Sequence, residues 1–261
     1  MTTTLLIALA ALVAVGAAAR STWSPCGLSM LSTITPMAEG SRGRRWGLTA
    51  AWFVLGAALG GATLGLLAVA GAFVVAAVDP SATVALGIAA VLAVATAAMD
   101  LGLGTEMPHH RRQVDEVWLD QYRSWVYGLG FGWQIGTGLA TYIMTAAVYL
   151  TIALAALTGS PLVAFGICVL FGAVRGLAIL LGLRLTVPER LRTFHRRFDE
   201  LGPTVRRVVI GLQMAVAVAA ATGAWGALGG AATAGVIAAL GFHTRTSFAR
   251  TTSETTLVAK A

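Results

Sequence analysis

Long apolar stretches alternate with short polar ones along this chain. Six of them contain the roughly 20 residues that a helix needs to cross a bilayer: 4–36, 46–78, 82–104, 126–158, 161–183 and 208–242. Several exceed that length, so we expect tilted, kinked or doubled-back spans. The pattern predicts an all-α polytopic membrane protein with six transmembrane helices, or seven if Gly229 and Gly230 turn the last stretch into a hairpin. A single transmembrane domain would cover residues 1–242, followed by a disordered polar tail at 243–261.

The composition supports a membrane protein and argues against a nucleic-acid partner. Of the 261 residues, 57% are hydrophobic and 11% are charged, whereas soluble domains carry about 25% charged residues. The mean hydropathy is +0.80. The net charge is +7, but the chain offers no soluble basic face on which nucleic acid would bind. We therefore expect the lipid bilayer as the partner. The first twenty residues lack the positive start of a signal peptide, and we expect them to remain as a membrane helix.

The basic residues predict the orientation of the spans. Arginines are concentrated at 39–45, 105–123 and 184–207, whereas the links at 79–81 and 159–160 contain no lysine or arginine. Because positively charged loops stay on the inner side, we expect three cytoplasmic basic loops and an external N-terminus. The predicted location is the inner membrane of a prokaryotic cell.

Two of the basic loops have residue patterns that suggest a binding site. At 187–198, basic side chains are interspersed with large apolar ones, which suits a helix lying on anionic headgroups; an orientation signal alone is the alternative. The other loop contains two histidines and two acids, at 109, 110, 115 and 116. Histidines beside arginines are more often solvated than metal-bound, so we predict no metal site and no cofactor.

Two parts of the chain resemble each other at an offset of 111 positions. The pattern Gly-Ala-x-x-Gly-Leu-x-x-x-x-Gly occurs at 61–71 and again at 172–182, and Trp23-Ser-Pro-Cys26 faces Trp133-Gln-Ile-Gly136 at nearly that offset. Three spans per unit is an odd number, so two such units have opposite orientations in the membrane. The sequence therefore predicts a 3+3 inverted repeat, about 4–104 and 126–228, with broken helices 1 and 4. Close packing of helices is the simpler interpretation of the glycines.

The stretch from Trp23 to Pro36 is the main candidate for a site. It lies in an apolar run, yet it contains two prolines, one cysteine and five hydroxyl residues. Proline bends or breaks a helix, and freed backbone groups persist in a membrane only where protein or water satisfies them. Pro25 can start a new helical piece and place Cys26 in its first turn, where a thiolate is favoured. A plain proline kink with an inert thiol is the alternative.

Further candidates lie in the second half of the chain. Arg175 is a charge in the middle of the fifth span, where charges usually indicate function, and Asp100 is its expected partner. Gln134 and Thr137 add polar groups to the fourth span, and helical rise places Gln134 and Cys26 in the inner half or near the centre of the bilayer. We predict a polar site there, formed by Trp23, Pro25, Trp133, Gln134, Thr137 and Arg175 around Cys26.

These residues resemble those of a known family. Ser24-Pro25-Cys26, followed by Leu28 and Pro36, resembles the first helix of the CcdA/DsbD membrane thiol–disulfide transporters, and Phe131-Gly132-Trp133 resembles the approach to their fourth helix. The resemblance implies six core helices in an inverted repeat. It also implies a relay of reducing equivalents from a cytoplasmic thioredoxin to extracytoplasmic thiol partners, including those of cytochrome c assembly, with Cys26 as the first redox cysteine.

The chain departs from that family at the second cysteine. Ile135, Gly136 and Thr137 occupy the positions where the fourth helix would carry Pro-Cys, so Cys168 is the remaining thiol that could resolve a disulfide on Cys26. Three functions therefore remain open. They are a divergent thiol relay or cytochrome c assembly protein, a transporter of a small solute or anion by alternating access, and a membrane scaffold without activity of its own.

Overall fold

The computed structural model describes residues 2–103 and 118–258, and the regular structure in these ranges is helical throughout. The loop residues 109, 110, 115 and 116, where no metal site is predicted, lie outside the described ranges. The elements, in chain order, are α1 (Thr2–Ser21), α2 (Pro25–Thr33), α3 (Pro36–Ser41), α4 (Trp46–Val78), α5 (Ala82–Leu101), α6 (Trp118–Gln121), α7 (Ser124–Thr137), α8 (Ala147–Leu157), α9 (Pro161–Leu177), the 3₁₀ helix η1 (Ala178–Arg184) and α10 (Pro188–Val258).

Within the described ranges, five helices are long and apolar enough to cross a membrane. They are Thr3–Ser21, Trp46–Val78, Ala82–Leu101, Pro161–Arg184 and Pro188–Ala239. The prediction of an all-α multi-pass membrane protein is therefore confirmed. The predicted fourth span is divided between α7 and α8, neither of which reaches that length, and this division accounts for five long helices rather than six.

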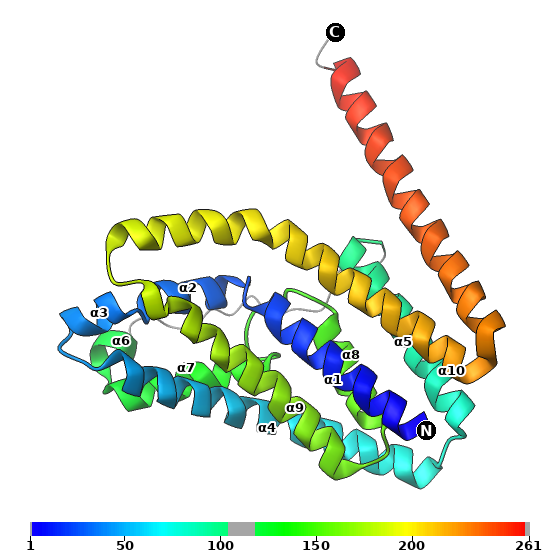
Figure 1. The fold of residues 1–261 in the computed structure, drawn as a ribbon, viewed down its shortest axis with the longest axis horizontal. Helices are drawn as coiled ribbons and strands as arrows, with labels where there is room; N and C mark the ends of the chain where they lie inside the picture. The colour runs from blue at the N-terminus through cyan, green and yellow to red at the C-terminus, as the bar shows by residue number, and fades with distance from the viewer. Residues whose placement is uncertain (1, 104–117, 259–261) are drawn as a thin grey trace.

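Helices α4 and α9 form the centre of the bundle, with α7 along α4, α1 against α8 and α9, and α5 beside α10 (Figure 1). The helices approach closely where glycines replace larger side chains. A Cβ atom at Gly61 would lie 3.0 Å from the Cα atom of Gly172, and one at Gly136 would overlap the carbonyl of Ala57. Small residues at these contacts permit the van der Waals packing that holds membrane helices together.

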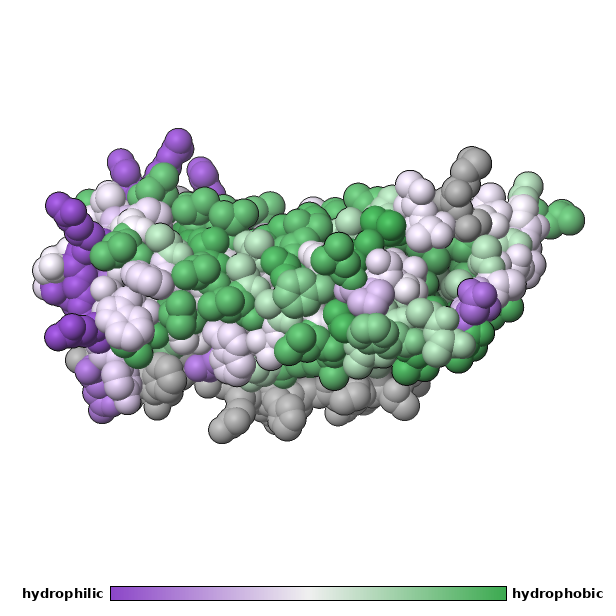
Figure 2. Space-filling view, turned by 90° about the horizontal axis from the view of Figure 1, so that it is seen from below, coloured by the Kyte–Doolittle hydropathy of each residue, from purple (hydrophilic) through white to green (hydrophobic). Residues whose placement is uncertain are grey.

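The two ends of the bundle differ in chemistry. Thr3 lies beside Asp79 and Gly159, so the start of α1 and the two links without basic residues meet at one end. Figure 2 shows the hydrophilic side chains gathered mainly at the opposite end, with a broad apolar surface between. This separation is typical of a protein whose middle lies in lipid. The assignment of the basic end to the cytoplasm stays a prediction.

The last helix turns sharply, although not at the predicted glycines. Gly226 has φ 71° and ψ −164° inside α10, a conformation that glycine adopts without the steric cost of a Cβ atom. Gly229 and Gly230 lie within the helix that follows, which projects away from the bundle (Figure 1). Helix α10 continues to Val258, and disorder of the tail at 243–261 stays a prediction.

Candidate functional site

The first span is interrupted three residues before Cys26, close to the place that the prolines predict. Helix α1 ends at Ser21, and α2 begins at Pro25 with Ser24 as its N-cap, whose hydroxyl accepts a 3.1 Å hydrogen bond from the Gly27 N–H. Proline is well suited to the first helical position because no donor is needed there. Cys26 is thus the second residue of α2, in the turn whose backbone N–H groups have no partner within the helix and whose dipole favours a negative charge.

The fourth span is interrupted between α7 and α8. Gly138, with φ 72°, ends α7, and its N–H donates to the Ile135 carbonyl at 3.1 Å. Residues 138–146 then run without regular helix before α8 begins. The structure therefore has breaks in both predicted spans, and the broken ends face the interior of the bundle.

Arg175 lies between the two breaks. Its side chain is 2% exposed, and Nη1 donates a 2.6 Å hydrogen bond to the carbonyl oxygen of Ile135. The guanidinium lies within electrostatic range of Cys26. Cys26 is itself 2% exposed. The side chain of the fifth predicted span therefore binds the end of α7, within electrostatic range of the first turn of α2.

The guanidinium of Arg175 is only partly satisfied. Within the described part of the chain, its Nε and Nη2 atoms are buried without a hydrogen-bond acceptor. These two atoms carry the parallel N–H groups along one edge of the guanidinium, the edge that binds two oxygens of a carboxylate or phosphate at once. The buried edge is the strongest polar feature of the site.

The expected ion pair between Arg175 and Asp100 is not formed. The carboxylate of Asp100 accepts hydrogen bonds from the Thr145 hydroxyl, the Ala146 N–H and the Gln213 side chain. Asp100 therefore satisfies the start of α8 from a neighbouring helix, in the way an N-cap does. The depth estimate failed because similar depth does not imply contact: α5 packs beside α10 and not along α9.

The other predicted site residues occupy different surroundings. Trp133 is 42% exposed, and its ring N–H donates to the Thr63 hydroxyl at 2.9 Å. The Thr137 hydroxyl donates to the Trp133 carbonyl within its own helix, and Gln134 is half-buried. Pro25 is exposed at the start of α2. Whether these residues bind a substrate stays a prediction.

Cys168 lies in an apolar environment. It is fully buried in a hydrophobic cluster with Leu64 and Phe171, and neither cysteine of the chain is in a disulfide. Cys168 precedes Arg175 by seven residues on α9, which is about two helical turns or roughly 10 Å along the axis. Its predicted role as the resolving cysteine stays a prediction.

The first part of α10 covers α2. The Trp23 ring stacks on Phe198 with centroids 4.4 Å apart, and its N–H donates to the Phe198 carbonyl at 2.7 Å. His195 and Ser32 share a hydrogen bond of 2.9 Å. We predicted that the apolar face of this segment would lie on lipid headgroups. Phe198 instead is 5% exposed and packs on protein, so the prediction of its partner is wrong. Sequence periodicity identified an amphipathic face but not the surface it would cover.

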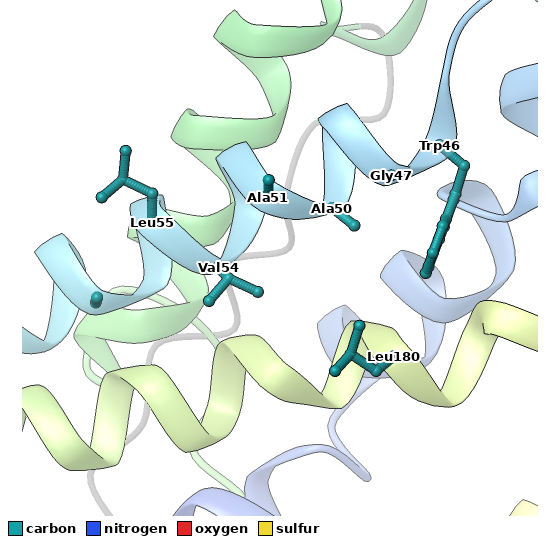
Figure 3. Close-up of a pocket in the computed structure, with 8 residues that line it drawn as sticks. Trp46, Gly47, Ala50, Ala51, Val54, Leu55 and Leu180 are labelled. Carbon is teal, nitrogen blue, oxygen red and sulfur yellow. The ribbon is translucent and has the colours of Figure 1, made fainter.

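An apolar groove opens on the side of the bundle between α4 and η1 (Figure 3). Trp46, Val54 and Leu180 are among its lining residues, and it encloses about 560 Å³. The ring N–H of Trp46 donates to the Ile34 carbonyl at 3.1 Å, which ties the end of α2 to the start of α4. The lining includes no ionisable side chain, so the groove supports contact with lipid rather than chemistry.

One contributor to the site had no signal in the side-chain pattern. Ile135 participates through its backbone carbonyl, which any residue offers. The charge in an apolar span did identify Arg175, and the proline–cysteine pair identified Cys26. The position of Arg175 between the two broken spans required coordinates.

Comparison with known proteins gives one group of relatives. No family model and no solved structure matches the chain. Three of the proteins with which it aligns carry the same description. The chain is similar to the methylamine utilization protein MauF. Identity is 33% to the protein of Paracoccus versutus, 28% to that of Methylophilus methylotrophus and 31% to that of Paracoccus denitrificans.

Each alignment with MauF covers 69% of this chain and, in the same order, 66%, 64% and 65% of the relative. The chain thus spans slightly less than two thirds of the length of these relatives.

Proposed function

We propose that this protein is a membrane-embedded accessory factor of methylamine utilization that acts in assembly by thiol–disulfide exchange at Cys26. The similarity to MauF supports the process, and the multi-pass helical fold supports the location. The observation that carries the chemistry is the position of a buried thiol in the first turn of a helix, beside a buried arginine.

Arg175 is a buried charge. A guanidinium away from water is costly unless a negative group compensates it. Among the described residues, the buried carboxylates bind groups other than Arg175: Glu39 binds Tyr127, and Asp100 binds Gln213. The sulfur of Cys26, in the first turn of α2, is the group that we assign to meet this charge when it reacts.

The proposed exchange passes two electrons through Cys26 in two steps. The Cys26 thiolate attacks a disulfide of an extracytoplasmic protein, the S–S bond breaks, and one partner sulfur leaves as thiolate. A thiolate of a cytoplasmic dithiol of the thioredoxin class then attacks the Cys26 sulfur and releases the second partner sulfur. Its other thiolate forms the dithiol's own disulfide and releases Cys26. Two electrons pass from the dithiol to the disulfide, and we assign both resolving thiols to the partners.

Reciprocal contacts support the inverted repeat on which such two-sided access depends. A Cβ atom at Gly61 would overlap the Cys168 carbonyl, and one at Gly172 would overlap the Ala57 carbonyl. Ala57 and Cys168 are themselves 111 positions apart, as are the two glycines. The glycines of the repeated pattern, Gly61 and Gly172, therefore meet where the antiparallel helices α4 and α9 cross, which is where an inverted repeat expects them.

A second pair of contacts repeats the relation. Gly65 is close to Phe165, and Gly176 is close to Val54, with each member again 111 positions from its counterpart. We infer that α4 and α9 cross near a pseudo-two-fold axis and that the breaks in the first and fourth spans lie on either side of it. This arrangement favours access to Cys26 from opposite faces in turn.

The test is thiol trapping in membranes that contain the full chain. Wild type and Cys168→Ala are expected to show Cys26 in a mixed disulfide, which the reductant-treated sample loses, and Cys26→Ser is expected to show none. Retention of methylamine-dependent growth by Cys26→Ser would exclude thiol exchange as the mechanism. Accumulation of the mixed disulfide in Cys168→Ala well above the wild-type level would return the resolving role to Cys168, because a resolving thiol is the group that breaks that disulfide.

A small-anion transporter on the same repeat is the second candidate, favoured by the two unsatisfied N–H groups of Arg175. It predicts that Cys26→Ser retains function while Arg175→Gln does not. Cys26→Ser therefore separates the two candidates, because only thiol exchange requires the sulfur.

A further inference from the structure

The unsatisfied edge of Arg175 has a defined chemical preference. Its third nitrogen, Nη1, is held by the Ile135 carbonyl at 2.6 Å, so the plane of the guanidinium is oriented by the end of α7. The Nε and Nη2 atoms remain, buried and without an acceptor among the residues described. Two parallel N–H groups match two coplanar oxygens, the arrangement found in a carboxylate.

The surroundings add to this preference. Arg175 is only 2% exposed. Burial strengthens an ionic hydrogen bond because little water competes with it. The first turn of α2 adds the positive end of a nine-residue helix, which also favours an anion. Cys26 belongs to that turn and lies within electrostatic range of the guanidinium of Arg175.

We propose that Arg175 and the first turn of α2 form a buried binding site for the carboxylate of a small molecule, next to the sulfur of Cys26. This site uses the thiol of Cys26 and therefore rests on the proposed function. It adds the chemical class of the ligand. A small thiol or disulfide that carries a carboxylate would be oriented by Arg175 with its sulfur toward Cys26. Arg175 is then a positioning residue, and Cys26 provides the reacting atom.

The test compares two alkylating reagents of nearly the same shape. Iodoacetate carries a carboxylate where iodoacetamide carries an uncharged amide; with either, the Cys26 thiolate forms a C–S bond and iodide leaves. The full chain in membranes, with Cys168→Ala so that Cys26 is the reporter, is treated with each reagent, and modification is followed by mass spectrometry. The rate ratio of iodoacetate to iodoacetamide is expected to be about tenfold higher in the folded protein than in the denatured chain.

Variants of the arginine separate the site from general reactivity. Arg175→Gln is expected to lower the ratio to that of the denatured chain. Arg175→Lys is expected to give an intermediate ratio, because lysine keeps the charge and lacks the two parallel donors. Arg184→Gln, an exposed arginine of η1, is the matched control and is expected to leave the ratio unchanged.

A measurement on the unaltered arginine covers the case in which Arg175→Gln does not fold. Propionate is expected to slow the reaction of Cys26 with iodoacetamide, and propionamide at the same concentration is not. Equal protection by the two, a ratio unchanged by Arg175→Gln in a folded variant, or no modification of folded Cys26 by either reagent would each overturn the site. A raised ratio without disulfide trapping would retain the site and reject the proposed function.

Discussion

The Tyr127 hydroxyl donates a 2.6 Å hydrogen bond to the carboxylate of Glu39, and both side chains are fully buried. Glu39 also accepts a 2.6 Å hydrogen bond from Thr49 and lies 3.5 Å from an Arg42 nitrogen. Three helices, α3, α4 and α7, are therefore joined at the basic end of the bundle by one carboxylate. The sequence placed Glu39 in an ordinary charged loop, and this role became visible only in the tertiary structure.

Removal of the Tyr127 hydroxyl is expected to destabilise the bundle. Tyr127→Phe leaves one buried donor to a carboxylate missing, which costs about 1.5–3 kcal/mol of unfolding free energy. Denaturant unfolding of the purified protein in bicelles measures the change. Tyr122→Phe, on a side chain that is 44% exposed, is expected to change stability little; equal effects of the two variants would contradict a network centred on Glu39.

Close approach of α4 and α9 predicts a large effect of one added methyl group. Gly172→Ala places a Cβ atom against the Ala57 carbonyl and the Gly61 backbone, so the helices must separate at a cost of about 1–3 kcal/mol. Gly166→Ala on the same helix has nothing within 4 Å of its Cβ atom and is expected to be neutral or stabilising. Thermal unfolding that ranks the two in the opposite order would disprove close packing at Gly172.

The carboxylate of Asp100 is expected to stabilise the second break. Asp100→Asn keeps the shape but lacks the charge, and its amide nitrogen accepts no hydrogen bond. Either the Thr145 and Gln213 donors or the Ala146 N–H then lose their acceptor. We expect a loss of about 1–3 kcal/mol, measured by unfolding in bicelles. The exposed Asp79 provides the control, since Asp79→Asn should behave as wild type.

The stacking of Trp23 on Phe198 predicts control of access to Cys26. An aromatic pair contributes about 0.5–1.5 kcal/mol beyond its buried area, so Phe198→Ala should speed iodoacetamide modification of Cys26 by about 2- to 10-fold. Leu201→Ala, on an exposed side chain of the same segment, should leave the rate at the wild-type value. An unchanged rate in Phe198→Ala would mean that α10 does not limit access.

Orientation in the membrane is tested by single thiols in a Cys26→Ala, Cys168→Ala background. Ser81→Cys should react with a membrane-impermeant maleimide added to intact cells, because the link at 79–81 is expected outside. Arg190→Cys should react only after the membrane is permeabilised. The reverse pattern would invert the predicted topology.

Several features of the site were predictable from local chemistry. Pro25 lacks a backbone donor, so a helix break close to Trp23 followed from the covalent structure alone. Arg175 is flanked by apolar residues. A charged side chain is costly in lipid, so Arg175 was expected to face the interior of the bundle. The partner of that arginine was not predictable, because Ile135 contributes a carbonyl and because Asp100 binds the start of α8 instead.

The sequence by itself determined that this is a helical membrane protein with several long apolar helices, and that the first span breaks close to Pro25. These properties follow from hydrophobic length and from proline, which act within about one helical turn to one span of the chain. Only the tertiary structure decided that Arg175 lies between Cys26 and Ile135, that α10 covers α2, and that the final turn is at Gly226. These are contacts between distant segments, and they depend on how helices pack, which a linear pattern of apolar and polar residues does not specify.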